Sequence, residues 1–195
     1  MKKLIILLVL FSTSFVLSAQ IGVGVRDNRY INVSYGFLRD WSVKFEESVY
    51  SEKIGFQYFR LYASYSRTFK MVDFKIEPYF GMTYNNSYSN EGISFEATLK
   101  PCKWVDVTGG VTPHNDSGFG YSTCYFGGFR FNFSHSVALT GSVTNRPEYR
   151  KPESRLRGGL RFNVNNLWVH PEVSAPVEKG EGKNIRMLVS MGYTF

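Results

Sequence analysis

Apolar and polar side chains alternate along most of the chain with a period of two residues. The segment 72–84 shows this best, because every second position is aliphatic, aromatic or proline: Phe74, Ile76, Pro78, Phe80, Met82 and Tyr84. Charged residues occupy positions between them, namely Asp73, Lys75 and Glu77. Strict alternation of this kind predicts β-strands with one apolar face and one polar face.

The same pattern elsewhere predicts an all-β protein of about twelve strands. The predicted strands are 20–26, 30–37, 41–49, 54–69, 72–85, 92–100, 104–112, 120–133, 136–144, 155–164, 167–174 and 185–195. Counts of ten or eight strands stay open, because the first segment is short and Pro171 removes a hydrogen-bond donor from the eleventh. Beyond residue 19, no run approaches the ~20 apolar residues that a membrane helix needs.

Short and long connections between the predicted strands alternate along the chain. Those after even-numbered strands are short: 38–40, 70–71, 101–103, 134–135 and 165–166. Several after odd-numbered strands are longer and more polar: 86–90, 113–119, 145–154 and 175–183. Membrane-spanning barrels have short periplasmic turns and longer outer loops, whereas a soluble β-sandwich has no reason to sort its connections. The pattern predicts a membrane-spanning antiparallel up-and-down β-barrel, whose first and last strands must pair because hydrocarbon satisfies no backbone polar group.

The first residues have a different character from the rest. Met1-Lys2-Lys3 is basic, the stretch from Leu4 to Leu17 is largely apolar, and Ser18 and Ala19 are small. This order is the signature of a secretory signal peptide. We expect residues 1–19 to be removed and residues 20–195 to form the barrel. An uncleaved membrane anchor is the alternative, but the apolar run is short for one.

Aromatic residues are expected to mark one rim of the barrel. Trp41, Trp104 and Trp168 each begin a predicted strand directly after a short turn. Indole rings favour the interface between membrane and water. We therefore predict that these three residues and the C-terminal Phe195 form an interface girdle.

The last predicted strand carries a recognisable motif. Its apolar positions alternate from Met187 to Tyr193, and the chain ends on the aromatic Phe195. This strand resembles the C-terminal signature of Gram-negative outer-membrane β-barrel proteins. The resemblance implies an outer-membrane location, membrane lipid as a partner, and recognition by the barrel assembly machinery through this strand. It leaves the subfamily and the oligomeric state open.

If the apolar faces contact lipid, the polar faces line the interior. The charged residues predicted there carry both signs: Lys44, Glu46, Arg60, Asp73, Lys75, Glu77, Glu96, Lys100, Asp106, Arg130, Arg157, Arg161 and Glu172. Buried charges must be paired or hydrated. Such an interior is either a network of ion pairs that closes the barrel or a narrow aqueous pore. The predicted number of strands does not distinguish a closed interior from a pore. Barrels of ~8 strands have a filled interior and those of 16–18 enclose a channel, and about twelve strands lie between these sizes.

Three functions are compatible with these features. The first is a small pore for passive transport of small hydrophilic solutes, and the second is a closed scaffold whose outer loops, such as 146–155, contact a partner. The third is a lipid-modifying hydrolase, for which His114 is the best base, with Asp116 and Ser117 beside it in a predicted outer loop. We predict no enzyme, because the hydrocarbon face carries no Ser–His pair.

Other chemistry finds little support in the sequence. The 3 histidines are scattered without ligand spacing, so we predict no metal site, and no glycine-rich turn opens a helix that would hold a cofactor. The formal net charge of +7 is dispersed over many strands, which disfavours a nucleic-acid partner. Cys102 and Cys124 are predicted to lie about 20 Å apart at ~3.3 Å per strand residue. That separation is too large for a disulfide, so two free thiols are expected.

Overall fold

A computed structural model describes residues 20–48, 58–145, 153–178 and 184–195. Regular structure in these ranges is entirely β-strand. No helix in the described part of the chain is long and apolar enough to cross a membrane. The predicted signal peptide lies outside the described residues and stays a prediction.

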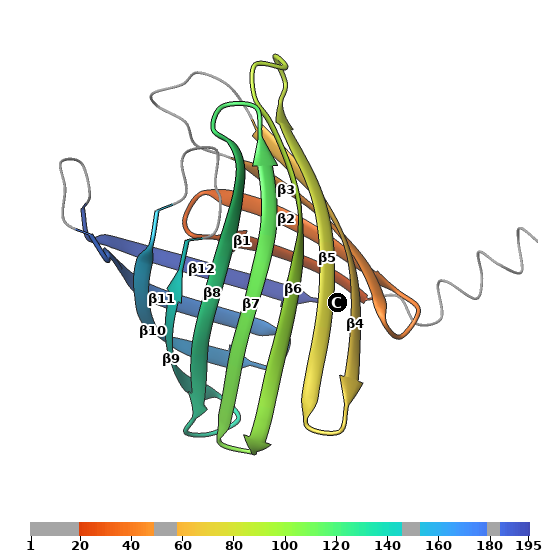
Figure 1. The fold of residues 1–195 in the computed structure, drawn as a ribbon. Helices are drawn as coiled ribbons and strands as arrows, with labels where there is room; N and C mark the ends of the chain where they lie inside the picture. Colours follow the sequence, from red (N-terminus) through yellow and green to blue (C-terminus); the bar gives the residue numbers. More distant parts are fainter. Residues whose placement is uncertain (1–19, 49–57, 146–152, 179–183) are drawn as a thin grey trace, which may run out of the picture.

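Twelve strands form one closed sheet (Figure 1). They are β1 Gln20–Arg26, β2 Tyr30–Phe37, β3 Trp41–Ser48, β4 Tyr58–Phe69, β5 Val72–Thr83, β6 Ser89–Cys102, β7 Val105–Asp116, β8 Gly120–Asn132, β9 Val137–Thr144, β10 Arg155–Val164, β11 Leu167–Pro176 and β12 Arg186–Thr194. Each pairs antiparallel with its sequence neighbours, and β1 pairs with β12. The predicted twelve-stranded up-and-down barrel is confirmed.

The register keeps apolar side chains on the outside of the barrel. Val33, Phe45 and Leu61 are successive cross-strand partners on β2, β3 and β4, and they are 45%, 37% and 50% exposed. An outer surface of this kind would be unstable in water but suits hydrocarbon, where the closed sheet satisfies its own backbone groups. The exterior is therefore a lipid-facing surface.

The connections at the two ends of the barrel differ as predicted. The turns that follow β4, β6 and β10 contain two residues each, 70–71, 103–104 and 165–166. These turns, together with the C-terminus, mark the periplasmic end in the arrangement typical of outer-membrane barrels. The outer end carries the longer connections after β9 and β11.

The outer loop predicted at 113–119 is shorter than expected, because β7 continues to Asp116, and the loop predicted at 86–90 lies at 84–88, because β5 ends at Thr83 and β6 begins at Ser89. The segment 113–116 is strand, and the β7–β8 connection is only 117–119. The alternation signal fails here because the outer ends of these strands carry polar residues on both faces. Asn115 points outward to Glu91, at 3.4 Å, whereas His114 points into the barrel.

The wall of the barrel is taller on one side. Strands β4 to β8 contain 12 to 14 residues each, whereas β1, β2 and β3 contain 7 or 8. Figure 1 shows β5 to β8 rising above the strongly inclined strands β1, β2 and β12. The outer mouth of the barrel is consequently oblique.

A turn reinforces the seam where the sheet closes. The β1–β12 register pairs only Gly22–Val25 with Met191–Thr194. Beyond it, the Asn28 backbone N–H donates to the Val189 carbonyl at 2.9 Å, and the Asn28 side chain accepts from the Val189 N–H at 2.8 Å. Asp27 and Asn28 have φ values of 55° and 57°, a left-handed pair that suits a tight hairpin turn. The β1–β2 turn thus continues the ladder that the short β1 leaves unfinished.

Candidate functional site

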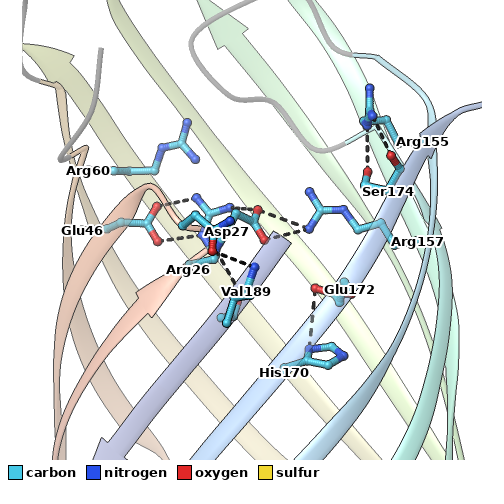
Figure 2. A network of polar contacts seen from close by, with 12 residues as sticks. Arg26, Asp27, Glu46, Arg60, Arg155, Arg157, His170, Glu172, Ser174 and Val189 are labelled. Atoms are coloured by element: carbon cyan, nitrogen blue, oxygen red, sulfur yellow. Dashed lines mark hydrogen bonds and ion pairs between the residues drawn. The ribbon is translucent and has the colours of Figure 1, made fainter. Parts of the chain in front are cut away.

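A chain of ion pairs crosses the outer half of the lumen (Figure 2). Arg26 of β1 donates to Glu46 of β3 twice, from Nε at 2.9 Å and from Nη2 at 2.8 Å. Asp27 accepts from Arg26 at 3.1 Å and from Nη1 of Arg157 on β10 at 3.1 and 3.2 Å. Figure 2 shows Arg26 between the two carboxylates and Arg157 beyond Asp27. Glu46 is only 1% exposed, and a buried carboxylate is stable only if an opposite charge and hydrogen-bond donors compensate it. Arg26 provides both.

Tyrosines extend this belt across β4 and β5. Arg60 donates to the hydroxyl of Tyr58 at 2.8 Å and to that of Tyr62 at 3.3 Å. Tyr62 donates in turn to Glu46 at 3.1 Å, and the Arg60 guanidinium lies 4.8 Å from the centre of the Tyr79 ring. Arg60 is therefore a buried lumen cation surrounded by aromatic rings and hydroxyls.

His114 requires a correction, because it does not lie in an outer loop. It belongs to β7, and its side chain is 1% exposed. Its Nδ1 lies 2.6 Å from the Tyr79 hydroxyl, and its Nε2 lies 3.2 Å from Asp116. Asp116 also accepts the backbone N–H groups of Gly118 and Phe119 and so shapes the β7–β8 turn. The group stabilises the outer end of the tall wall from inside the lumen.

Ion pairs on the same strand or on neighbouring strands line the inner half of the lumen. The pairs are Lys75 with Glu77, Lys100 with Asp73, and Arg130 with Asp106. Arg161 of β10 differs, because among the described residues no carboxylate pairs with it. Its Nε donates to Asn163 at 3.1 Å, and its guanidinium lies 4.4 Å from the centre of the Trp168 ring.

Trp168 also requires a correction, because it is not part of a lipid-facing girdle. It pairs in register with Gly192, and a Cβ on Gly192 would lie 2.8 Å from its indole ring. Its contacts with Arg161 and Gly192 place the ring inside the barrel. The prediction relied on its place after a short turn, but the parity of β11 puts Trp168 on the same face as His170. Trp41, Trp104 and Phe195 are 46%, 46% and 70% exposed at the periplasmic end.

Two adjacent cavities lie in the lumen. The outer one, of about 280 Å³, is lined by residues from β1 and from every strand between β3 and β11. The inner one, of about 380 Å³, is lined by strands β5 to β11. Both are bordered by Phe126, Ser142 and Glu172, so they meet at this level. A lining drawn from ten of the twelve strands places these cavities in the lumen.

Eleven of the thirteen charged residues predicted for the lumen line its two cavities; Lys75 lines a third cavity, and Glu46 bonds Arg26 and Tyr62. Sequence reasoning missed several lumen groups: Arg26, Asp27, Tyr62, Phe126 and Arg155. Arg26 could have been found from the parity of β1, whose Ile21 and Val23 point outward. Asp27 lies in a turn, where no periodic signal exists.

Arg155 stood in two predictions, as the first residue of the strand 155–164 and as the last residue of the outer loop 146–155, and the structure has it as the first residue of β10. It is 7% exposed and donates to the Ser174 side chain at 2.8 Å and to the Asn184 carbonyl at 2.8 Å. Charge alternation in the sequence could not distinguish this buried anchor from the solvated residues around it.

The closed sheet, the apolar exterior and the charged lumen define a transmembrane β-barrel of the outer-membrane type. The fold is similar to that of the KdgM porin, with a TM-score of 0.61 and 14% identity over 91% of this chain and 98% of that one. A KdgM porin in complex with disordered oligogalacturonate gives a TM-score of 0.63 and 15% identity over the same shares. The NanC porin gives 0.53 and 10%, also over 91% and 98%. No family model and no curated protein matches the sequence.

Proposed function

We propose that the chain is a passive pore for small hydrophilic solutes in the outer membrane of a Gram-negative bacterium. The observation that carries this proposal is the pair of adjacent cavities in the lumen, which are lined mainly by charged and polar side chains from β1 and from β3 to β11. A scaffold barrel has no need for polar cavities of this size in its lumen. The porin fold of the structural neighbours supports the same function.

The lining of the outer cavity carries charges of both signs, and Glu46 and Asp27 compensate Arg26 and Arg157 beside it. Its charged residues are Arg26, Lys44, Arg60 and Arg157 against Glu77 and Glu172. One structural neighbour is a porin in complex with disordered oligogalacturonate, a solute that carries carboxylates. We infer that this cavity admits polar and charged solutes.

Conductance in a planar lipid bilayer tests the pore. The mature chain, residues 20–195, would be folded in detergent and its folded state checked by heat-modifiable gel mobility. Discrete current steps are the expected result. A folded barrel that gives no steps at any voltage would contradict the proposal.

A closed scaffold is the second candidate function. The observation that favours it is the buried belt from Glu46 through Arg26 and Asp27 to Arg157, which narrows the outer lumen. The absence of current steps from a folded barrel would support this function instead. A hydrolase is not proposed, because His114 lies inside the barrel and Ser117 bonds the backbone N–H of Ser89 at 2.9 Å.

Export and assembly belong to the same proposal. We infer that residues 1–19 direct export and that the barrel assembly machinery recognises β12 and Phe195. Phe195 supports this role, because its side chain is 70% exposed and its ring lies 4.9 Å from that of Tyr193. An aromatic pair on the outside of the closing strand is accessible to a partner before insertion.

A further inference from the structure

The outward face of the described strands carries very few charged side chains. At the outer end of the barrel they are Glu47 of β3 and Glu91 of β6, and at the periplasmic end the only one is Arg67 of β4. Arg67 shares its face with Leu61, which is 50% exposed, because an even number of residues separates the two in the strand. A cation on this face requires a reason, since a charge that faces hydrocarbon destabilises a barrel unless it lies near the interface.

Arg67 lies at the level of the aromatic girdle and not beyond it. Tyr65 precedes it on the same face, and the Tyr65 ring lies 5.0 Å from that of Trp41. Phe69, two residues closer to the periplasmic turn, is 67% exposed, and Phe74, the register partner of Arg67, is 51% exposed. Exposed apolar side chains therefore surround the guanidinium. Aromatic rings and cations occur together in this way at the boundary between hydrocarbon and water.

The Arg67 guanidinium has one hydrogen-bond partner among the described residues. Its Nη1 donates to the Tyr65 hydroxyl at 3.4 Å. Asp40 lies within electrostatic range of it, but no ion pair joins the two side chains in the described part of the chain. A guanidinium presents its N–H donors as a planar fork that matches the oxygens of a phosphate. Most of these donors remain for a ligand.

The wall leaves room beside Arg67 on the side of β3. This strand begins at Trp41, the register partner of Tyr65, so no strand residue pairs with Arg67 on that side. The β2–β3 turn lies there instead, and its Arg39 and Asp40 border the same cavity as Arg67, of about 490 Å³. The other charged residues of this cavity occupy strand positions that face the lumen, so the charge at the rim comes from these three. Two cations against one carboxylate leave a net charge of +1, which one phosphodiester would balance.

We propose that Arg67 and Arg39 bind the phosphate of an anionic phospholipid in the periplasmic leaflet, while the Tyr65 hydroxyl holds the Arg67 fork in place. The acyl chains of this lipid extend toward the membrane centre along Phe74 and Ile76, which are 51% and 42% exposed. A lipid is the occupant because the apolar exterior places this face against the membrane. The site goes beyond the proposed transport function, because it exists whether or not the lumen conducts.

Native mass spectrometry of the folded barrel in detergent tests this inference. The mature chain, residues 20–195, is mixed with phosphatidylglycerol or with phosphatidylcholine of the same acyl chains, and the fraction of barrel that retains a lipid is measured. Both headgroups contain a phosphate, but the choline ammonium cancels its charge. The wild-type barrel is expected to retain phosphatidylglycerol more strongly. Excess inorganic phosphate is not expected to displace it, because the acyl chains also bind, and displacement would overturn the assignment to a lipid.

Three variants locate the effect. Arg67→Gln is expected to lower retention of phosphatidylglycerol by about two- to five-fold, because water weakens an exposed charge contact to this range. Arg67→Lys is expected to lower it less, since an ammonium keeps the charge but loses the fork. Lys103→Gln is the matched control: it removes another cation of the periplasmic rim, outside the lumen, whose ammonium lies 4.9 Å from the centre of the Trp104 ring. This control is expected to change nothing.

Three results would overturn the site. Equal losses in Arg67→Gln and Lys103→Gln would mean that the lipid follows the overall charge of the rim. Equal retention of the two lipids by the wild-type barrel would mean that the headgroup charge is not recognised, and full retention by Arg67→Gln would mean that the lipid binds elsewhere. Heat-modifiable gel mobility first confirms that each variant is folded. If Arg67→Gln does not fold, Tyr65→Phe takes its place and is expected to lower retention of phosphatidylglycerol. None of these results depends on conductance, so failure of the lipid site is separate from failure of the pore.

Discussion

Individual residues shape the lumen where an aromatic ring lies over a glycine. Gly110 of β7 is an example, because a Cβ there would collide with the Phe126 ring and the Phe95 carbonyl. Phe126 in turn borders both cavities. Glycine in a strand allows this close approach of ring and backbone. The size of the passage is therefore set partly by a residue that has no side chain.

Replacing Gly110 by Ala is expected to destabilise the barrel by about 1–3 kcal/mol through overpacking. Gly109 is the matched control, because the nearest atom to its added Cβ is the Phe126 carbonyl oxygen at 4.0 Å. Its change to Ala should cost less than about 0.5 kcal/mol. Urea unfolding of both variants in lipid measures the difference, and equal midpoints would contradict this packing.

Arg157 and Arg161 contribute positive charge to the two cavities. Changing both to Gln is expected to shift ion selectivity toward cations, because the acids of β5 to β7 remain. The reversal potential in a KCl gradient measures this shift, with Lys103→Gln as the control. An unchanged reversal potential would mean that neither cation faces the permeating ions.

The cysteines report the register independently. The predicted free thiols are confirmed: Cys102 is exposed and Cys124 is buried. A thiol reagent should therefore label one site in the folded barrel and two after denaturation, as read from intact mass. Fast labelling of Cys124 in the folded state would contradict the position of β8.

Alternation was sufficient to assign lumen residues because a strand has only two faces. It gave Glu46, Glu96 and Arg161 correctly, since these lie in the middle of regular strands. It could not give Asp27 or the burial of His114, which depend on turns and on cross-strand partners distant in sequence. Trp168 was misplaced because general preference for the interface was given more weight than parity.

Among the structural elements, the β1–β2 turn is the one on which closure of the barrel depends. The Asn28 side chain accepts from the Val189 N–H and donates to the Met187 carbonyl at 3.2 Å. Asp27 adds a bond from its N–H to the Ser190 hydroxyl at 3.0 Å. The turn thereby lengthens a seam that the seven residues of β1 would leave short.

Asn28→Ala should lower stability by about 1–3 kcal/mol, because it removes two hydrogen bonds at the seam. Asn86→Ala is the matched control, since Asn86 has the same φ of 57° in the β5–β6 turn. Both variants lose the tolerance of asparagine for this conformation, but only the first breaks the link to β12. Faster amide exchange at Val189 in the first variant alone is the expected result, and equal exchange would contradict this role.

Strand boundaries were predicted best where one face meets lipid. The bounds of β1, β2 and β10 agree with those read from alternation. The outer ends of β6 and β7 were missed, because above the lipid both faces are polar and the period of two disappears.

The barrel as a whole is closed by its C-terminal strand, β12, which pairs with β1. The Phe195 backbone N–H donates to the Ile21 carbonyl at 2.8 Å, and its ring lies outside. Deleting Phe195 should leave folding in detergent intact, because only one backbone hydrogen bond is lost, at about 0.5–1.5 kcal/mol. In cells, the amount in the outer membrane should fall several-fold. Loss of folding in detergent as well would show that the residue acts through stability alone.

Sequence alone could predict the closed barrel, since hydrocarbon permits no unpaired strand edge. It could not decide whether the lumen is open. That depends on how side chains such as Arg26, Asp27 and Arg157 meet across strands that are more than a hundred residues apart in the chain.

The unequal wall has a consequence for the surrounding membrane. The seven residues of β1 span about 23 Å even if the strand stood upright, whereas twelve residues of β5 span about 40 Å. The apolar band of outer-membrane barrels is about 25 Å tall, and an inclined strand covers less of it than its full length. The bilayer must therefore thin beside β1 to β3, or the barrel must lean, and hydrophobic mismatch would then vary around its circumference. Lipids with shorter acyl chains should gather on that side, so that the protein sorts its own annulus of lipids.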